Sequence, residues 1–143
     1  MNKLLNLILK SVDDHRSLIP RLVVGLVFLS EGIQKFLFPD SVGAGRFEKI
    51  GFTHPEMLAS LVATFEMICG LMMLAGFFVR LAAIPLLTIM ATAIITTKIP
   101  ILTGKGFWQM AHDSRTDLSM TMLLIFIFIY GAGRFSADRC LRS

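Results

Sequence analysis

Long apolar stretches alternate with short polar segments along most of this chain of 143 residues. A helix needs roughly 20 mostly apolar residues to cross a bilayer, and four stretches approach that length. The pattern therefore predicts an all-α fold, namely a four-helix transmembrane bundle that forms a single domain over residues 1–143. The predicted spans cover approximately residues 18–38, 57–78, 81–97 and 118–133.

Residues 1–17 form a separate arm in front of the first predicted span. Between Asn2 and Val12, leucine and isoleucine recur at helical spacing, and Lys3 and Lys10 lie on the opposite side. Such a segment is typical of a short amphipathic helix that lies in the membrane interface. A frayed terminus is the alternative.

Composition supports burial of the apolar stretches in lipid. The mean hydropathy is +0.71, hydrophobic residues make up 55% of the chain and charged residues 17%, which is too apolar for so short a soluble domain. The net charge of +4 suits contact with anionic lipid, whereas the basic and aromatic pattern of a nucleic-acid-binding protein is missing. Cys69 and Cys140 fall at different predicted depths, so we expect no disulfide between them. The sequence has no metal-ligand or nucleotide motif.

The distribution of Lys and Arg predicts the orientation. Basic residues concentrate in the N-terminal arm, in the turn between the second and third spans, and in the C-terminal tail. Because basic residues favour the cytoplasmic side, we expect a multi-pass protein of the cytoplasmic (inner) membrane with both termini in the cytoplasm. The residues that carry this expectation are Lys3, Lys10, Arg16, Arg21, Arg80, Arg134, Arg139 and Arg142.

Two glutamates lie inside predicted spans, where an ionised acid is normally paired, protonated or beside a cavity. Glu31 and Glu66 fall at nearly the same depth on adjacent helices, so a proton shared between the two carboxyls is plausible. Gln34 and Lys35 lie on the same helical stripe as Glu31. The alternatives are a structural ion pair between Glu31 and Lys35 and a structural hydrogen-bonding role for Glu66.

More polar groups gather before the last predicted span. His112, Asp113, Arg115 and Asp117 occupy the predicted outer loop, and Thr92, Thr96 and Thr97 lie in the outer half of the third span. The inner half of the predicted bundle is almost wholly apolar, so we expect a pocket that opens outward and no continuous channel. His112 as a solvated surface residue, and the two aspartates as charges that complement a helix dipole, are the structural alternatives.

A third group of charges lies at the predicted cytoplasmic ends of the helices. Arg21, Arg80, Arg134 and Asp138 share this face, and Arg134 and Asp138 are four residues apart. We expect these four residues to tie the helix ends together and to serve stability.

Motifs along the chain resemble the DoxX family in order and spacing. The resemblance covers nearly the whole chain after Ser17 and includes two signatures of one branch near the end. The matching segments are Arg21-Leu-Val-Val-Gly25, Glu31-Gly32-Ile-Gln-Lys35-Phe36, Glu66-Met-Ile-Cys-Gly70, Gly76-Phe-Phe-Val-Arg80, His112-Asp113-Ser-Arg115-Thr116-Asp117 and Gly131-Ala-Gly133-Arg134-Phe-Ser136-Ala-Asp138. The resemblance implies a four-helix membrane bundle with a loose link to redox chemistry. Relatives include the membrane subunit of thiosulfate:quinone oxidoreductase and a mycobacterial membrane complex of thiol and oxidant defence.

Two functions are compatible with these residues. The first is a membrane subunit of an oxidoreductase that binds a quinone or a small redox solute and acts as an enzyme only with a soluble or membrane redox partner. In this interpretation Glu31 and Glu66 handle protons, Lys35 and Arg115 stabilise an oxyanion, and His112 with Asp113 relays protons to bulk water. The second is a non-enzymatic scaffold or small-solute carrier that acts as an oligomer. Small-residue faces on the first two spans allow either internal packing or a homodimer: Gly25 with Gly32, and Ala63 with Gly70.

Overall fold

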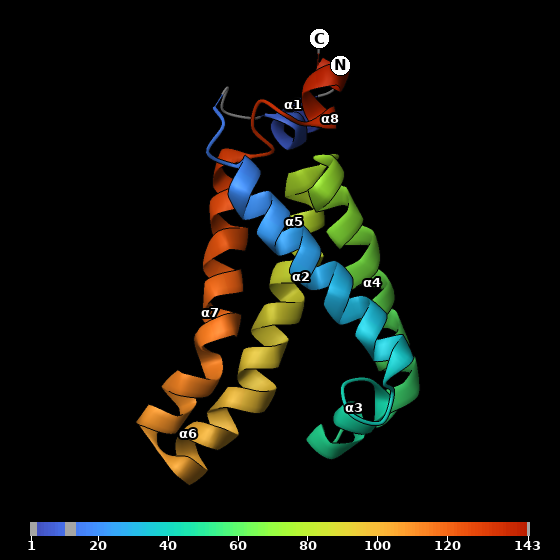
Figure 1. Cartoon of the computed structure of the whole chain (residues 1–143), viewed down its shortest axis with the longest axis vertical. Coiled ribbons are helices and arrows are strands. Elements are labelled where there is room, and N and C mark those ends of the chain that lie inside the picture. The colour runs from blue at the N-terminus through green and yellow to red at the C-terminus, as the bar shows by residue number, and fades with distance from the viewer. Residues whose placement is uncertain (1–2, 11–13, 143) are drawn as a thin grey trace.

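The structure, a computed structural model, describes residues 3–10 and 14–142, and every element assigned within them is a helix. The all-α fold class predicted from the hydrophobic pattern is therefore confirmed. Four long helical segments run lengthwise through the molecule (Figure 1), and short helices lie at its two ends. The long segments are α2 (Leu18–Leu37), α4 (Pro55–Ala75), a continuous run from Val79 to Lys105, and α7 (Phe107–Tyr130); the short helices are α1 (Lys3–Leu9), α3 (Ala44–Ile50) and α8 (Ala137–Arg142).

The third long segment extends beyond its predicted end near Pro100. It consists of α5 (Val79–Ala93), a π-helix η1 (Ile94–Lys98) and α6 (Ile99–Lys105). Pro100 lies in the first turn of α6, where the missing N–H of proline breaks no helical hydrogen bond. The helix therefore continues past the proline.

Helix α7 also begins well before the predicted start at Leu118. It starts at Phe107, directly after Gly106 with φ of 91°, a backbone conformation that favours glycine. The polar segment from His112 to Asp117, which was expected to be a loop, is consequently helical. Its side chains are therefore fixed on a rigid element.

Helices α2 and α4 pack most extensively against each other, and small residues bring their backbones together. A Cβ added to Gly32 would lie 2.8 Å from the carbonyl oxygen of Ala63, and one added to Gly70 would lie 2.9 Å from the amide nitrogen of Leu29. The sequence left open whether these small-residue faces serve internal packing or dimerisation. In the structure the faces of α2 and α4 pack against each other within the chain. Close approach of this kind is typical of helix pairs in membrane proteins.

The second helix pair, α5 and α7, meets the first pair at one end of the molecule. Fully buried core residues come from all four helices there, for example Val24, Met73, Leu86 and Leu124. Figure 1 shows α1, α8 and both chain ends at this end, which we call the terminal end. The two pairs diverge toward α3 and α6, and we call that side the open end.

Two arginines hold the last turn of α7 and the segment beyond it at the terminal end. Nη1 of Arg21, which is buried, donates to the carbonyl oxygen of Ala132 at 2.6 Å. Nη2 of Arg80 donates to the carbonyl oxygen of Ile129 at 2.6 Å. Carbonyls at a helix C-terminus lack partners within the helix and carry partial negative charge, so Arg80 caps α7 at Ile129, whereas Arg21 holds the segment after the helix end at Tyr130.

Asp138 joins α8 to the turn between α4 and α5. Its carboxylate accepts hydrogen bonds from the amides of Phe78 at 2.6 Å and Val79 at 3.2 Å. Burial raises the pKa of Asp138, although the two amide donors and the charge of Arg21 oppose that rise. Arg134, which we expected to tie the helix ends together with Asp138, lies before the start of α8 at Ala137. The exposed Arg134 holds the terminal end through its amide, which donates to the carbonyl oxygen of Asp14 at 3.0 Å.

We expect Arg80→Ala to reduce the yield of folded protein more than it changes any ligand binding. Nη1 of Arg80 also donates to the carbonyl oxygen of Leu7 at 3.1 Å, so the change removes contacts to both α1 and α7. Loss of such charged hydrogen bonds costs about 2 kcal/mol or more. Detergent-solubilised yield and monodispersity by size-exclusion chromatography measure the effect, with the exposed Arg115→Ala as the control. Normal yield with lost ligand binding would contradict the structural role.

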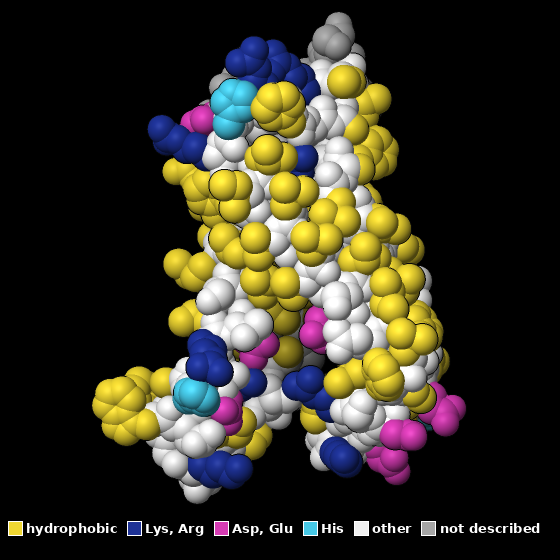
Figure 2. All heavy atoms as spheres, in the orientation of Figure 1, with side chains coloured by type: hydrophobic (Ala, Val, Ile, Leu, Met, Phe, Trp, Pro, Cys, Tyr) yellow, Lys and Arg dark blue, Asp and Glu magenta, His cyan; other side chains and the backbone are white. Residues whose placement is uncertain are grey.

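Two helical segments are long and apolar enough to cross a membrane by length and composition: Pro55–Ala75 and Val79–Lys105, each with a hydropathy of 1.9. Helix α2 carries Arg21, Glu31 and Lys35, and α7 has a polar first half. In Figure 2, hydrophobic side chains form a band across the middle of the visible face, while basic, acidic and histidine side chains gather toward the two ends.

Candidate functional site

A cavity of about 570 Å³ lies between the two diverging helix pairs. One wall comes from α2, α3 and α4, and the other comes from α5, η1 and α7. Figure 2 shows the hollow near the open end, with charged side chains around it. Apolar side chains dominate the lining, among them Phe28, Phe47, Phe65, Ile89 and Met120.

Three charged side chains form one ion cluster on the first wall. Nζ of Lys35 lies 2.7 Å from Oε2 of Glu66 and 3.7 Å from Oε2 of Glu31. The side chains of Lys35 and Glu66 are only 10% and 4% exposed, whereas that of Glu31 is 44% exposed. The lysine therefore shares its charge between a tight buried pair and a looser contact at the cavity surface.

The sequence predicted this cluster but with a different order of contacts. The common depth of Glu31 and Glu66 made a shared proton one possibility, and an ion pair between Glu31 and Lys35 was the alternative. Instead Lys35 contacts both acids, because α2 places it one turn beyond Glu31 and α4 presents Glu66 opposite it. Each carboxylate has a cationic partner, so their mutual repulsion is offset.

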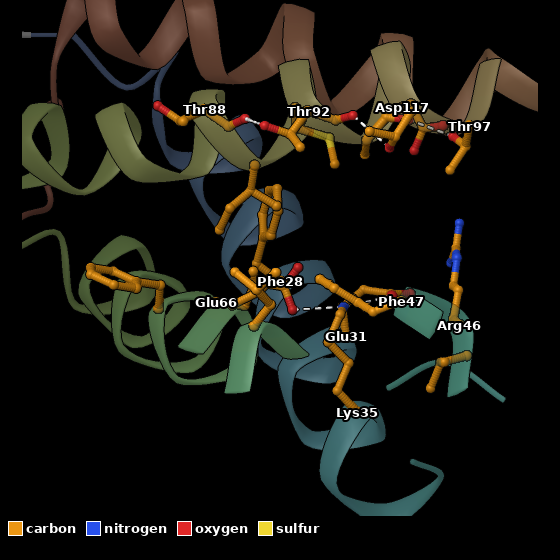
Figure 3. Close-up of a pocket in the computed structure, with 18 of the residues that line it drawn as sticks. Phe28, Glu31, Lys35, Arg46, Phe47, Glu66, Thr88, Thr92, Thr97 and Asp117 are labelled. Atoms are coloured by element: carbon orange, nitrogen blue, oxygen red, sulfur yellow. Dashed lines mark hydrogen bonds and ion pairs between the residues drawn. The ribbon is translucent and has the colours of Figure 1, made fainter. Parts of the chain in front are cut away.

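Arg46 adds a second cation to the first wall, and its place in the cavity lining was not predicted. It lies on α3, an unpredicted helix that ends at Gly51 with φ of 101°. Figure 3 shows Arg46 across the cavity from Thr97. Its side chain lines the cavity, is exposed, and makes no ion pair with any other residue that the structure describes. Short segments with apolar and basic residues are common between spans, so this pattern does not single out Arg46 as a cavity residue.

Threonines give the second wall a different character. Thr88, Thr92, Thr96 and Thr97 line the cavity from α5 and η1, and Figure 3 shows Thr88, Thr92 and Thr97 along the wall opposite Lys35. The sequence indicated the last three of these threonines but missed Thr88. Their side chains add polar atoms to this wall without adding charge.

Of the four polar residues expected before the last span, Asp117 alone belongs to the cavity lining. Oδ2 of Asp117 lies 2.9 Å from Nζ of Lys98, which comes from η1. This ion pair was not expected, because Lys98 directly follows the predicted third span at residues 81–97 and Asp117 was expected in a loop. The extension of both helices brings the two residues together.

The remaining predicted site residues face other surroundings. His112 and Arg115 are exposed on α7, and Asp113 accepts hydrogen bonds from the side-chain amide of Gln109 at 3.1 Å. The amide of Gln34 donates to Oγ of Ser30 at 2.9 Å. The cavity lining includes none of His112, Asp113, Arg115 and Gln34, all of which are described residues.

An apolar helical chain with a charged cluster inside an apolar cavity defines a helical membrane protein with an internal polar site. The DoxX family model matches residues 17–99. The chain is also 51% identical over 127 residues to the uncharacterized membrane protein Rv3486 of Mycobacterium tuberculosis, with 85% of this chain and 78% of that protein covered. This chain therefore belongs to the DoxX family and is a membrane protein. No solved structure matches it.

The family match includes the Glu31, Lys35 and Glu66 cluster and the threonine-bearing segment, and it ends at residue 99. Asp117 and the later motifs lie beyond it.

Proposed function

We propose that this DoxX family protein is the membrane subunit of an oxidoreductase system and binds a quinone, or a small redox solute of similar chemistry, in the cavity between its helix pairs. The observation that carries the proposal is the buried Lys35–Glu66 ion pair at the edge of an apolar cavity of about 570 Å³. Ligand sites are typically apolar pockets of this size with a few convergent polar groups.

The proposed setting is a four-helix transmembrane bundle in the cytoplasmic membrane. Helices α2, α4, the Val79–Lys105 segment and α7 would cross the bilayer, and both termini would lie in the cytoplasm. Two of these segments are apolar enough to span by themselves, and basic residues of the N-terminal arm and the C-terminal tail lie at the terminal end. The positive-inside tendency supports this orientation, in which the cavity opens to the opposite side.

The residues of the cavity fit a quinone headgroup. Its ring needs an apolar and aromatic slot, which Phe28, Phe47 and Phe65 supply. Its carbonyl oxygens need hydrogen-bond donors, and Lys35 and Arg46 are the cationic donors on the lining. The other apolar side chains that dominate the lining would contact an apolar tail.

A bound quinone would supply two-electron chemistry that is coupled to protons. Lys35 would donate a hydrogen bond to a carbonyl oxygen and hold the ring beside α2. Glu31 is the half-exposed acid of the cluster, so it is placed to exchange protons with the cavity, and Glu66 would keep Lys35 in position. Electrons would come from a soluble or membrane partner. His112, Asp113 and Arg115 lie away from the cavity lining and take no part in this arrangement.

The test is mass spectrometry of small molecules and lipids bound to gently purified protein. We expect a co-purified quinone in the wild type and its loss in Glu66→Gln, with Glu31→Gln as a second variant that leaves the buried pair intact. Glu48→Gln is the matched control, because Glu48 is exposed on α3 and outside the lining. No quinone in the wild type, or binding that is unchanged in both cavity variants, would contradict the proposal.

A specific observation favours the second candidate function, a small-solute carrier. Pro85, which has no N–H to donate, lies inside α5, and the π-helix η1 follows it, so the regular α-helical hydrogen bonding of one cavity wall is broken at two places although the helical run continues. Interrupted helices line the binding sites of many transporters, and π-helical turns often mark functional sites. A bound solute other than a quinone in the same mass spectra would support this carrier function.

A further inference from the structure

Three threonines on the second wall all donate their hydroxyl hydrogen to backbone carbonyl oxygens. The hydroxyl of Thr88 donates to the carbonyl oxygen of Ile84 at 3.0 Å, that of Thr92 to Thr88 at 2.9 Å, and that of Thr96 to Thr92 at 2.7 Å. We call Thr88, Thr92 and Thr96 the threonine stripe. All three residues line the cavity.

Each hydroxyl has one proton, and in this stripe that proton is already donated to the backbone of the same helix. The hydroxyl oxygens keep their lone pairs, so they face a ligand as hydrogen-bond acceptors. A ligand that offers its own O–H groups matches the stripe directly. A ligand that offers only acceptors would require the threonines to give up their backbone bonds.

The spacing of the stripe sets a second requirement. Thr88 and Thr92 are one turn apart in α5, so their positions are separated by about 6 Å along the helix axis, close to the distance between the two oxygens of a para-hydroquinone. Glu31, on the opposite wall, is a half-exposed carboxylate that also accepts hydrogen bonds. Acceptors therefore face the cavity from both walls.

We propose that the cavity binds the reduced, hydroquinone form of its ligand in preference to the quinone form, through donation of ligand hydroxyl groups to the threonine stripe. This inference rests on the proposed quinone site and adds its selectivity. Lys35 and Arg46 serve either form as donors, whereas the stripe favours only the form with O–H groups.

The experiment measures the affinity of the purified full-length protein for a decyl-substituted para-benzoquinone and for its dithionite-reduced hydroquinone, by anaerobic isothermal titration calorimetry in detergent. We expect the wild type to bind the hydroquinone about tenfold more tightly. Thr92→Val, which removes the hydroxyl and keeps the shape of the side chain, should lower hydroquinone affinity about tenfold and so abolish that preference. Thr88→Val is a second variant with the same expected effect.

The matched control is Thr64→Val. Thr64 makes the same kind of bond, from its hydroxyl to the carbonyl oxygen of Ser60 at 2.7 Å, but it is exposed on α4 and outside the cavity lining. This variant should keep the wild-type preference. If loss of any helical threonine altered helix geometry enough to affect binding, Thr64→Val would also lose the preference for the hydroquinone. That result would overturn the inference.

The outcomes separate the inference from the proposal on which it rests. Equal binding of both forms by the wild type, or a preference that survives in both stripe variants, overturns the role of the stripe and leaves the quinone site standing. Absence of binding of either form overturns both. A preference that is lost in the stripe variants and kept in Thr64→Val supports both.

Discussion

Replacement of Lys35 by methionine should lower the free energy of unfolding by about 3–5 kcal/mol, the range found when one partner of a buried ion pair is removed. Lys35 and Glu66 are both nearly inaccessible, and Nζ of Lys35 lies within 4 Å of the carboxylates of both Glu66 and Glu31. Without the lysine, two acids remain beside an apolar cavity with no cation in contact. The measurement is unfolding in mixed detergent micelles, followed by circular dichroism.

The double variant Lys35→Met with Glu66→Met should recover most of the lost stability, because an apolar pair of similar volume replaces the ion pair and the remaining acid, Glu31, is half-exposed rather than buried. Lys49→Met is the control, since Lys49 is exposed in the last turn of α3. If the single and double variants are equally unstable, the cost comes from packing and the electrostatic account is wrong. Ligand binding should be lost both in Lys35→Met and in the double variant.

Gly70→Ala should destabilise the protein by about 1–3 kcal/mol, the usual cost of overpacking. The new Cβ would lie 2.9 Å from the amide nitrogen of Leu29 and 3.0 Å from the carbonyl oxygen of Gly25. Both contacts are backbone atoms of α2, so no side chain can move away and the two helices must separate. The same micelle unfolding experiment measures the change.

Gly104→Ala is the matched control for this prediction. Gly104 lies in α6, and a Cβ there would meet nothing within 4 Å. Alanine is favoured over glycine in a helix by about 1 kcal/mol, so this variant should be neutral or slightly more stable. Equal effects of the two substitutions would show that the α2–α4 contact does not depend on close backbone approach.

Much of the fold could be predicted from the sequence because apolar length is a strong signal. The start of α2 at Leu18 agrees with the predicted start, and the predicted second span begins within two residues of Pro55, the start of α4. The errors came from local backbone chemistry. Pro100 was interpreted as a helix end, but it lies in the first turn of α6, directly after the π-helix η1. A π-helix has no clear signature in a single sequence.

The candidate site was predictable where its residues share one helix or one depth. Glu31 and Lys35 share α2, and Glu66 was predicted at the depth of Glu31; in the structure Lys35 contacts both acids. Arg46 and Asp117 reach the same cavity through an unpredicted helix and an early helix start. The direction in which a threonine hydroxyl donates depends on its side-chain rotamer, so the spacing of the threonines alone could not show that the threonine stripe donates to backbone carbonyls.

Both chain ends lie at the end of the molecule away from the cavity (Figure 1). The helical rise alone places Glu31 about 20 Å from the first residue of α2. An affinity tag or a fluorescent protein on either terminus should therefore leave the mouth of the cavity clear. In the proposed orientation, an electron donor that docks at the cytoplasmic face would stand a helix length from the bound ring. An electron donor that reaches the bound ring directly would then have to approach from the open end, where α3 and α6 lie.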